Sequence, residues 1–202
     1  METKVFSIDV LIQMADGGDL LSQFKLAEAY FRGEKVEKNL EKAFYWYSCA
    51  AERGHLNSEF QLGLCYAHGW GTSQDFNESV KWLRMAAKRG HAGAQNCMGV
   101  RYATGQGVEP DEGEAAKWYR LASEQGHAVA QFNLALLYVY GQGVPQSYAE
   151  AYVWFTLSAN QGDDLAKESS ERMAEAMSPE ELKRAKSRIR ELTPKNATTT
   201  SI

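Results

Sequence analysis

The chain has 202 residues, of which 44% are hydrophobic and 24% are charged, and its formal net charge is −4 at pH 7. This balance is typical of a globular chain that folds in water. The negative net charge argues against nucleic-acid binding, which usually needs a strongly basic face. No stretch approaches the roughly 20 apolar residues that cross a bilayer, so we expect no membrane insertion.

The cysteines and the first residues bear on the cellular compartment. Cys49, Cys65 and Cys97 are an odd number at irregular intervals, which favours small buried side chains over a disulfide framework. The first ten residues carry one lysine and an apolar stretch that Asp9 interrupts, a poor match to a secretory signal. We therefore expect a cytoplasmic protein; a periplasmic or secreted location stays open if a signal peptide preceded this sequence.

Residues 1–17 are predicted to form an N-terminal capping helix, centred on residues 6–15, ahead of a repeated region. From residue 18 onward, five columns of residues recur every 36 positions, which indicates an all-α solenoid of helix–turn–helix repeats. The columns define four units, residues 18–53, 54–89, 90–125 and 126–161. The recurring residues are Gly18, Gly54, Gly90, Gly126 and Gly162; Leu26, Leu62, Met98 and Leu134; Tyr30, Tyr66, Tyr102 and Tyr138; Gly33, Gly69, Gly105 and Gly141; and Trp46, Trp82, Trp118 and Trp154.

Each unit reads as two helices. The apolar and small residues of the first helix form one stripe, which Arg101 interrupts in the third unit. A pair of glycines then predicts a tight turn, and the Trp column of the second helix is expected to fill the space between successive hairpins. The glycine that opens the next unit is expected in a left-handed conformation at the helix end. Capping boxes are predicted to start the second helices, at Asp75 with Glu78, Asp111 with Glu114, and Ser147 with Glu150.

Residues 162–192 read as a degenerate fifth unit, which closes the array with two capping helices. Asp163 or Asp164 can cap the first, which is expected to end near Met177. Ser178, Pro179 and Glu181 predict the start of the second, and its later basic residues suit the helix dipole and read as a solvated face. Residues 193–202 have no periodicity and are predicted to be a disordered tail.

The pattern resembles the Sel-one-like repeat, a variant of the tetratricopeptide repeat with a longer turn between its helices. The resemblance implies a right-handed α–α superhelix whose relatives are common in bacteria and act as adaptors and scaffolds that bind proteins or peptides. The first unit departs from the pattern at Glu34 and Lys35, which leaves its turn shape open. The third unit carries the pattern through Gly90, Ala94, Gln95, Gly99, Tyr102, Gly105, Gly107, Val108, Asp111, Ala115, Trp118 and Tyr119.

Three features could suggest metal binding, phosphate binding or catalysis, but a structural role explains each of them better. His55, His91 and His127 share one repeat position, yet stacked helices lie about 8–10 Å apart, whereas each ligand of a zinc ion approaches to about 2.1 Å. Gly105 and Gly107 flank a turn between two helices rather than a phosphate loop after a strand. No nucleophile–base signature appears, and the paired cysteines of relatives connected with β-lactam hydrolysis are absent. We expect no catalysis, no metal and no cofactor.

The resemblance also implies where a partner would bind, because the first helices line the concave face of a tetratricopeptide array. The residues so placed are aromatic and aliphatic with a few amides, as in a peptide site. The alternative is that Phe24, Phe60 and Phe132 are buried between units and leave no groove. Arg101 either serves a carboxylate or points outward, and we prefer the latter. The predicted peptide-binding residues are Phe60, Asn96, Val100, Phe132, Asn133, Leu136 and Tyr140, with the asparagines bonded to the partner's backbone.

Two functions from different classes follow. The first is a monomeric, non-catalytic adaptor that captures a peptide or protein partner in the groove. The alternative is a structural subunit that holds a larger assembly through its convex face and caps. Loss of a partner on changing groove residues would favour the first, and loss only on changing the cap helices or the convex side would favour the second.

Overall fold

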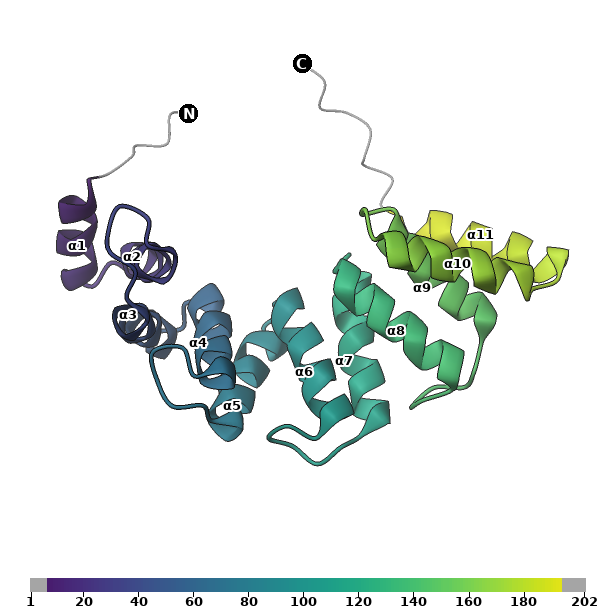
Figure 1. Cartoon of the computed structure of the whole chain (residues 1–202), viewed down its shortest axis with the longest axis horizontal. Coiled ribbons are helices and arrows are strands. Elements are labelled where there is room, and N and C mark those ends of the chain that lie inside the picture. Colours follow the sequence, from purple (N-terminus) through teal and green to yellow (C-terminus); the bar gives the residue numbers. More distant parts are fainter. Residues whose placement is uncertain (1–6, 194–202) are drawn as a thin grey trace, which may run out of the picture. The chain divides into compact units, whose positions relative to one another are not determined.

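A computed structural model describes residues 7–193, which form eleven α-helices and no strand (Figure 1). The prediction of an all-α fold is confirmed. The beginning of the N-terminal segment and nearly all of the predicted tail, residues 1–6 and 194–202, lie outside the described residues. The helices are α1 (Ile8–Asp16), α2 (Leu20–Arg32), α3 (Leu40–Glu52), α4 (Leu56–His68), α5 (Phe76–Lys88), α6 (Ala92–Thr104), α7 (Glu112–Glu124), α8 (Ala128–Tyr140), α9 (Tyr148–Ala159), α10 (Asp164–Glu175) and α11 (Pro179–Leu192).

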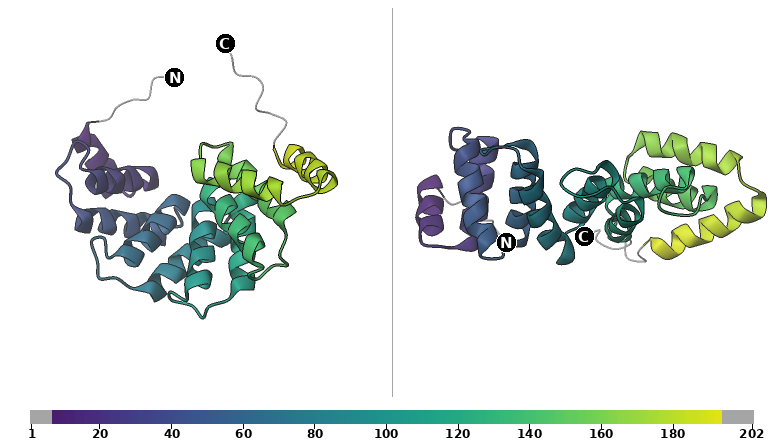
Figure 2. Two further views of the ribbon diagram at one scale, coloured as in Figure 1. Left: turned by 45° about the vertical axis from the view of Figure 1, so that its right-hand side comes forward. Right: turned by 90° about the horizontal axis from the view of Figure 1, so that it is seen from below.

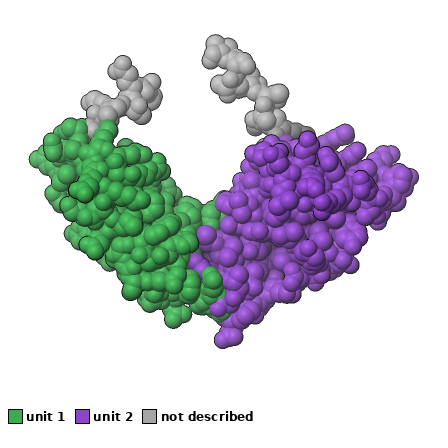
Figure 3. Space-filling model, viewed as in Figure 1, with its two compact units in different colours: residues 1–94, 106–108 green, residues 95–105, 109–202 purple. Residues whose placement is uncertain are grey.

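The chain divides into two compact units (Figure 3). Unit 1 comprises residues 1–94 and 106–108, and unit 2 comprises residues 95–105 and 109–202. In unit 1, α2 packs on α1 and α3, and α4 packs on α3 and α5. In unit 2, α9 packs on α8, α10 and α11, and α8 also packs on α7 (Figure 2). Between residues 7 and 193, no helix is both long enough and apolar enough to cross a membrane.

Helix ends follow the repeat. The glycine that opens each unit has positive φ in all five instances, from 82° at Gly54 to 96° at Gly162, as the sequence predicts. The first turn glycine closes the first helix, for example at Gly69 with φ 70° and ψ 32°. Glycine is the residue that adopts this conformation without a steric penalty. The two glycine columns therefore set where each helix ends.

The second turn glycine is required by close packing as well as by its backbone angle. A Cβ at Gly71 would lie 2.1 Å from the carbonyl oxygen of Leu40, and one at Gly143 would lie 2.1 Å from that of Glu112. Each of these turns thus rests on the first turn of the preceding second helix. Lys35 stands at this position in the first unit and keeps the same left-handed conformation, with φ 65°. The turn shape that the sequence left open is therefore the regular one.

The predicted capping boxes form only in part. Asp75, Asp111 and Ser147 do accept backbone N–H groups of their helices. Their own backbone N–H groups, however, donate to the carbonyl oxygens of the Tyr column, for example Asp75 to Tyr66 at 2.9 Å. The glutamate of each box is therefore not needed as an acceptor, and Glu78 and Glu114 pair with lysines instead. Ser178 and Glu181 form the complete box at the start of α11.

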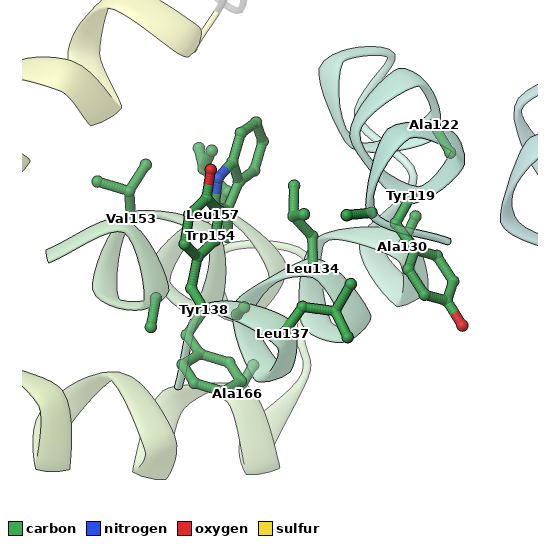
Figure 4. Packing of buried hydrophobic residues seen from close by; sticks show 14 of the residues in the cluster. Tyr119, Ala122, Ala130, Leu134, Leu137, Tyr138, Val153, Trp154, Leu157 and Ala166 are labelled. Atoms are coloured by element: carbon green, nitrogen blue, oxygen red, sulfur yellow. The ribbon is translucent and has the colours of Figure 1, made fainter. Parts of the chain in front are cut away.

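The core corrects the role assigned to the Trp column. Trp154 is fully buried among Leu134, Tyr138 and Leu157 (Figure 4), whereas the other three tryptophans of the column are only partly buried. The column one residue later is buried throughout, as Tyr47, Leu83, Tyr119 and Phe155. Glycines of the first helices receive these side chains, because a Cβ at Gly99 would lie 2.5 Å from Tyr119 Cδ1. Small residues on one helix thus accommodate large ones on the next.

Candidate functional site

The three register-equivalent histidines begin helices. Nδ1 of His55 accepts the backbone N–H of Ser58 at 3.2 Å, and Nδ1 of His127 accepts that of Ala130 at 3.2 Å. His91 does the same for Ala94 at 3.1 Å. Asp19 and Asp163 occupy this repeat position in the outer units and cap α2 and α10. The histidines are therefore N-caps, a role for which a side-chain acceptor is needed.

A second polar column ties the two helices of a hairpin together in the second, third and fourth units. Glu59, buried in α4, forms an ion pair of 2.5 Å with Arg89, which also donates to the carbonyl oxygen of Gly54 at 3.0 Å. In the fourth unit the same positions are amides, and Gln161 donates to Gln131 at 2.9 Å. In the first unit, Gln23 donates instead to the carbonyl oxygen of Ala15 and Arg53 to that of Gly18. These contacts are structural, because a buried polar group needs a partner.

Six of the seven predicted peptide-binding residues lie in unit 2, on α6 and α8. On α8, Phe132, Asn133, Leu136 and Tyr140 follow the i, i+1, i+4, i+8 spacing of one helix face, and Val129 lies on the same stripe. Val129 is 56% exposed and Tyr140 is 68% exposed, while Phe132 and Leu136 are partly buried. We call Asn96, Val100, Val129, Phe132, Asn133, Leu136 and Tyr140 the α6–α8 face.

The two asparagines of this face bond to each other. Asn133 Nδ2 donates to Asn96 Oδ1 at 3.2 Å, and this hydrogen bond joins α8 to α6. This bond uses neither the Asn96 amide N–H groups nor the Asn133 side-chain carbonyl oxygen. The sequence predicted both side chains as part of a binding surface but did not reveal that they bond to each other.

Phe60 and Phe132 of the predicted site are partly exposed and also pack on neighbouring aromatic rings. Phe132 meets the buried Phe155 edge to face at 5.3 Å between ring centroids. Phe60 lies in unit 1, where its ring stacks on His91 at 4.3 Å and would be 3.1 Å from a Cβ at Gly93. Both side chains keep partial exposure. Both rings are therefore partly exposed and partly packed, and the groove stays a prediction.

Arg101 contradicts the preferred interpretation. Its side chain does not extend outward into solvent: the residue is 8% exposed. Burial lowers the pKa of its guanidinium, while the nearby Cys97 acts in the opposite direction. Burial raises the pKa of the Cys97 thiol, because it disfavours the charged form of either group. A protonated thiol is a poor nucleophile, so this pair is suited to packing rather than to covalent chemistry.

Unit 1 carries a polar cluster that the sequence did not reveal. The hydroxyl of Tyr47 on α3 donates to Glu28 Oε1 on α2 at 2.5 Å, and Arg32 forms an ion pair with the other oxygen of Glu28 at 2.7 Å. Gln61 on α4 donates to Glu28 at 3.4 Å. Burial and the Glu28 carboxylate raise the pKa of Tyr47. Glu28 does not recur at its repeat position, so the sequence gave no pattern that would have predicted this cluster.

The described residues contain no group of three or more His, Cys, Asp or Glu side chains placed to hold a metal ion. Cys49, Cys65 and Cys97 are not joined in disulfides. The polar groups described above cap helices, tie hairpins or join neighbouring helices. Large apolar side chains that remain exposed include Leu21, Val129 and Tyr140 on first helices and Met85 and Leu121 on second helices, and such residues suit contact with another chain.

The Sel1 repeat model matches residues 20–55, 56–91, 92–127 and 128–163. No curated protein matches the chain. Among solved structures, a protective antigen of uropathogenic Escherichia coli with an SLR fold is 32% identical, with a TM-score of 0.80 over 95% of this chain. The chain spans 44% of the length of that antigen.

A Sel1 repeat protein from Oxalobacter formigenes is 28% identical, with a TM-score of 0.77, over 94% of this chain and 76% of that one. An immunity protein from Pseudomonas aeruginosa is 20% identical, with a TM-score of 0.54, over 92% of this chain and 73% of that one, and shares the fold. The four matched repeats cover most of the sequence. The chain therefore belongs to the Sel1 repeat family, whose members generally serve as scaffolds for protein–protein interaction.

Proposed function

We propose that the chain is a non-catalytic adaptor that binds a peptide or protein segment on the α6–α8 face. The observation that carries the proposal is the exposure of Val129 and Tyr140 at the two ends of a stripe whose middle residues are half-buried. A monomer that leaves two large apolar side chains on one helix face, beside amides, presents a surface suited to a partner.

The chemistry of the face suggests an extended segment with at least one apolar side chain. Leu136 and Val100 offer aliphatic contact, and Tyr140 offers an aromatic anchor with a hydroxyl at its rim. The Asn96–Asn133 bridge is held in place by its own hydrogen bond. Its remaining donors and acceptor suit a peptide backbone, which presents one N–H and one C=O per residue.

The experiment is site-specific photocrosslinking in the native host. A photoreactive phenylalanine analogue replaces Tyr140 on the α6–α8 face or, as a control, exposed Lys117 on α7. The proposal expects a partner crosslinked from position 140 and not from 117. Tyr140→Ala should then weaken that purified partner at least about tenfold, since aromatic anchors dominate such interfaces, while the melting temperature stays unchanged. Equal crosslinking from both positions, or unchanged affinity, would refute it.

Phe60 and the remaining expectations stay predictions. Phe60→Ala should weaken the same partner if the binding surface extends to α4, and should leave it unchanged if the surface is confined to the α6–α8 face. Light scattering tests the expected monomer. Fractionation of the host tests the expected cytoplasmic location. The absence of catalysis also remains part of this proposal.

A further inference from the structure

The outer side of α5 carries a basic groove that differs from the equivalent surfaces of the other repeats. A cavity of about 390 Å³ is lined by one stripe of α5 together with Gly107, all within unit 1. Met85 is one of its lining residues and is 42% exposed. We call the lining residues of the helix the α5 stripe; they are Asn77, Val80, Lys81, Arg84, Met85 and Lys88.

Charge separates this stripe from its counterparts. It holds three cationic residues, Lys81, Arg84 and Lys88, and no acidic one. The equivalent positions of α3 hold no cationic residue and include Glu41 and Glu52. Those of α7 keep two cations, Lys117 and Arg120, but hold Glu124 in place of Lys88. Glu78 pairs with Lys81 from within α5, at 3.2 Å. With Glu78 counted, the formal charge around the exposed methionine is still positive.

The protein itself shows what can cover such a stripe. On α9 the equivalent positions include Val153 and Leu157, which are 1% and 8% exposed. Helix α11 packs against α9 within unit 2 (Figures 1 and 2), and Ile189 and Leu192 of α11 pack on the same core. At one end Arg188 of α11 forms an ion pair of 3.0 Å with Glu150 of α9. An amphipathic helix thus covers the outer stripe of one second helix, with complementary charge at its edge.

We propose that the α5 stripe is a docking surface for an amphipathic, acidic helix of a partner protein, which would lie on α5 as α11 lies on α9. The apolar stripe of that helix would cover Val80 and Met85. Its flanking carboxylates would meet Lys81, Arg84 and Lys88, a complementarity that gives specificity and a fast association rate. This surface is separate from the α6–α8 face, so either site can exist without the other.

The test uses two synthetic helices derived from α11. The probe has the sequence of Pro179–Leu192 with Glu at all five basic positions, and the control peptide has the natural sequence. Both keep Leu182, Ala185, Ile189 and Leu192. Fluorescence anisotropy with the full chain measures binding at low and high salt. The proposal expects the acidic peptide to bind at least about tenfold more tightly than the natural one, with affinity falling as salt rises.

Two matched variants locate the site. Met85→Glu on α5 should weaken the acidic peptide at least about tenfold, because it places a repelling charge in the middle of the stripe. Leu121→Glu, at the same repeat position on α7, should leave its affinity unchanged. Both residues are exposed, and circular dichroism verifies that both variants fold.

Equal binding of the two peptides would overturn the proposal, as would equal effects of the two variants or no effect of Met85→Glu. Tyr140→Ala should leave the acidic peptide unaffected. Because Tyr140 belongs to the α6–α8 face, this variant distinguishes failure of the α5 docking proposal from failure of the proposed adaptor function.

Discussion

Acid should destabilise this protein through its histidine N-caps. The Nδ1 atoms of His55, His91 and His127 accept backbone N–H groups at the starts of α4, α6 and α8. A protonated imidazole has only donors, so protonation removes the cap and places a cation at the positive end of the helix dipole. Protonation therefore opposes the folded state at three consecutive first helices.

The direction of the pH dependence follows from the same contacts. Burial lowers the pKa of His55, which Arg89 also lowers and Glu59 opposes, and burial lowers the pKa of His127. The unfolded chain therefore takes up these protons first, near the ordinary pKa of about 6.5. Stability should be complete above that pH and should fall as the pH drops through the folded-state pKa values.

The size of the effect follows from the caps. Loss of one N-cap costs about 1 kcal/mol, and a cation at a helix N-terminus costs roughly 0.3–1 kcal/mol more. Three caps together give about 4–6 kcal/mol if they act independently. This is a large fraction of the roughly 5–15 kcal/mol that stabilises a typical domain.

Urea unfolding followed by circular dichroism, between about pH 8 and pH 5 across the histidine range, measures this loss. His127→Asp is the informative variant, because Asp19 and Asp163 already cap helices at the same repeat position. An aspartate accepts the N–H at both pH values and suits the dipole, so the variant should lose about 1–2 kcal/mol less than the wild type between these limits. An identical acid loss in the variant and the wild type would refute the reasoning.

Three further predictions concern packing and can be checked by denaturant melts. Gly99→Ala should destabilise the protein by about 1–3 kcal/mol, because the new methyl group meets the ring of Tyr119; no destabilisation would mean that the ring moves freely. Trp154→Ala should cost about 3–5 kcal/mol and Trp118→Ala clearly less, since only Trp154 is fully buried; equal costs would contradict this ranking. Glu59→Gln should destabilise by roughly 1–3 kcal/mol through the loss of its ion pair with Arg89, and adding Arg89→Gln should restore part of it by recreating the amide pair of the third and fourth repeats. If the double variant is less stable than Glu59→Gln alone, the amide and ionic versions are not interchangeable.

Much of the fold could be predicted from the sequence, because the same residues recur in each unit and indicate the same local structure. The glycine columns predicted the helix ends, and positive φ at Gly54 and Gly162 agrees with them. Ser178 and Pro179 predicted the start of α11. Such signals are local: they depend on the backbone angles and hydrogen bonds of a few consecutive residues.

The partners of side chains could not be read in this way, because they depend on contacts between helices. Arg101 is buried although its sequence context favoured an outward position. The N–H groups that a capping box would satisfy with glutamate go to tyrosine carbonyls from the preceding helix. The Asn96–Asn133 bond joins residues 37 positions apart, one more than the repeat length, so no column of the sequence revealed it.

The sequence by itself therefore determined the class of fold, the ends of its helices and the family, since a period of 36 residues constrains local backbone geometry in every unit. Only the tertiary structure decided which apolar residues are core and which are surface. Trp118 and Trp154 occupy one column, yet only Trp154 is fully buried; Leu121 and Leu157 occupy another, yet only Leu157 is covered. The physical reason is that burial depends on the neighbouring helix, and α11 packs on α9 at the end of the array.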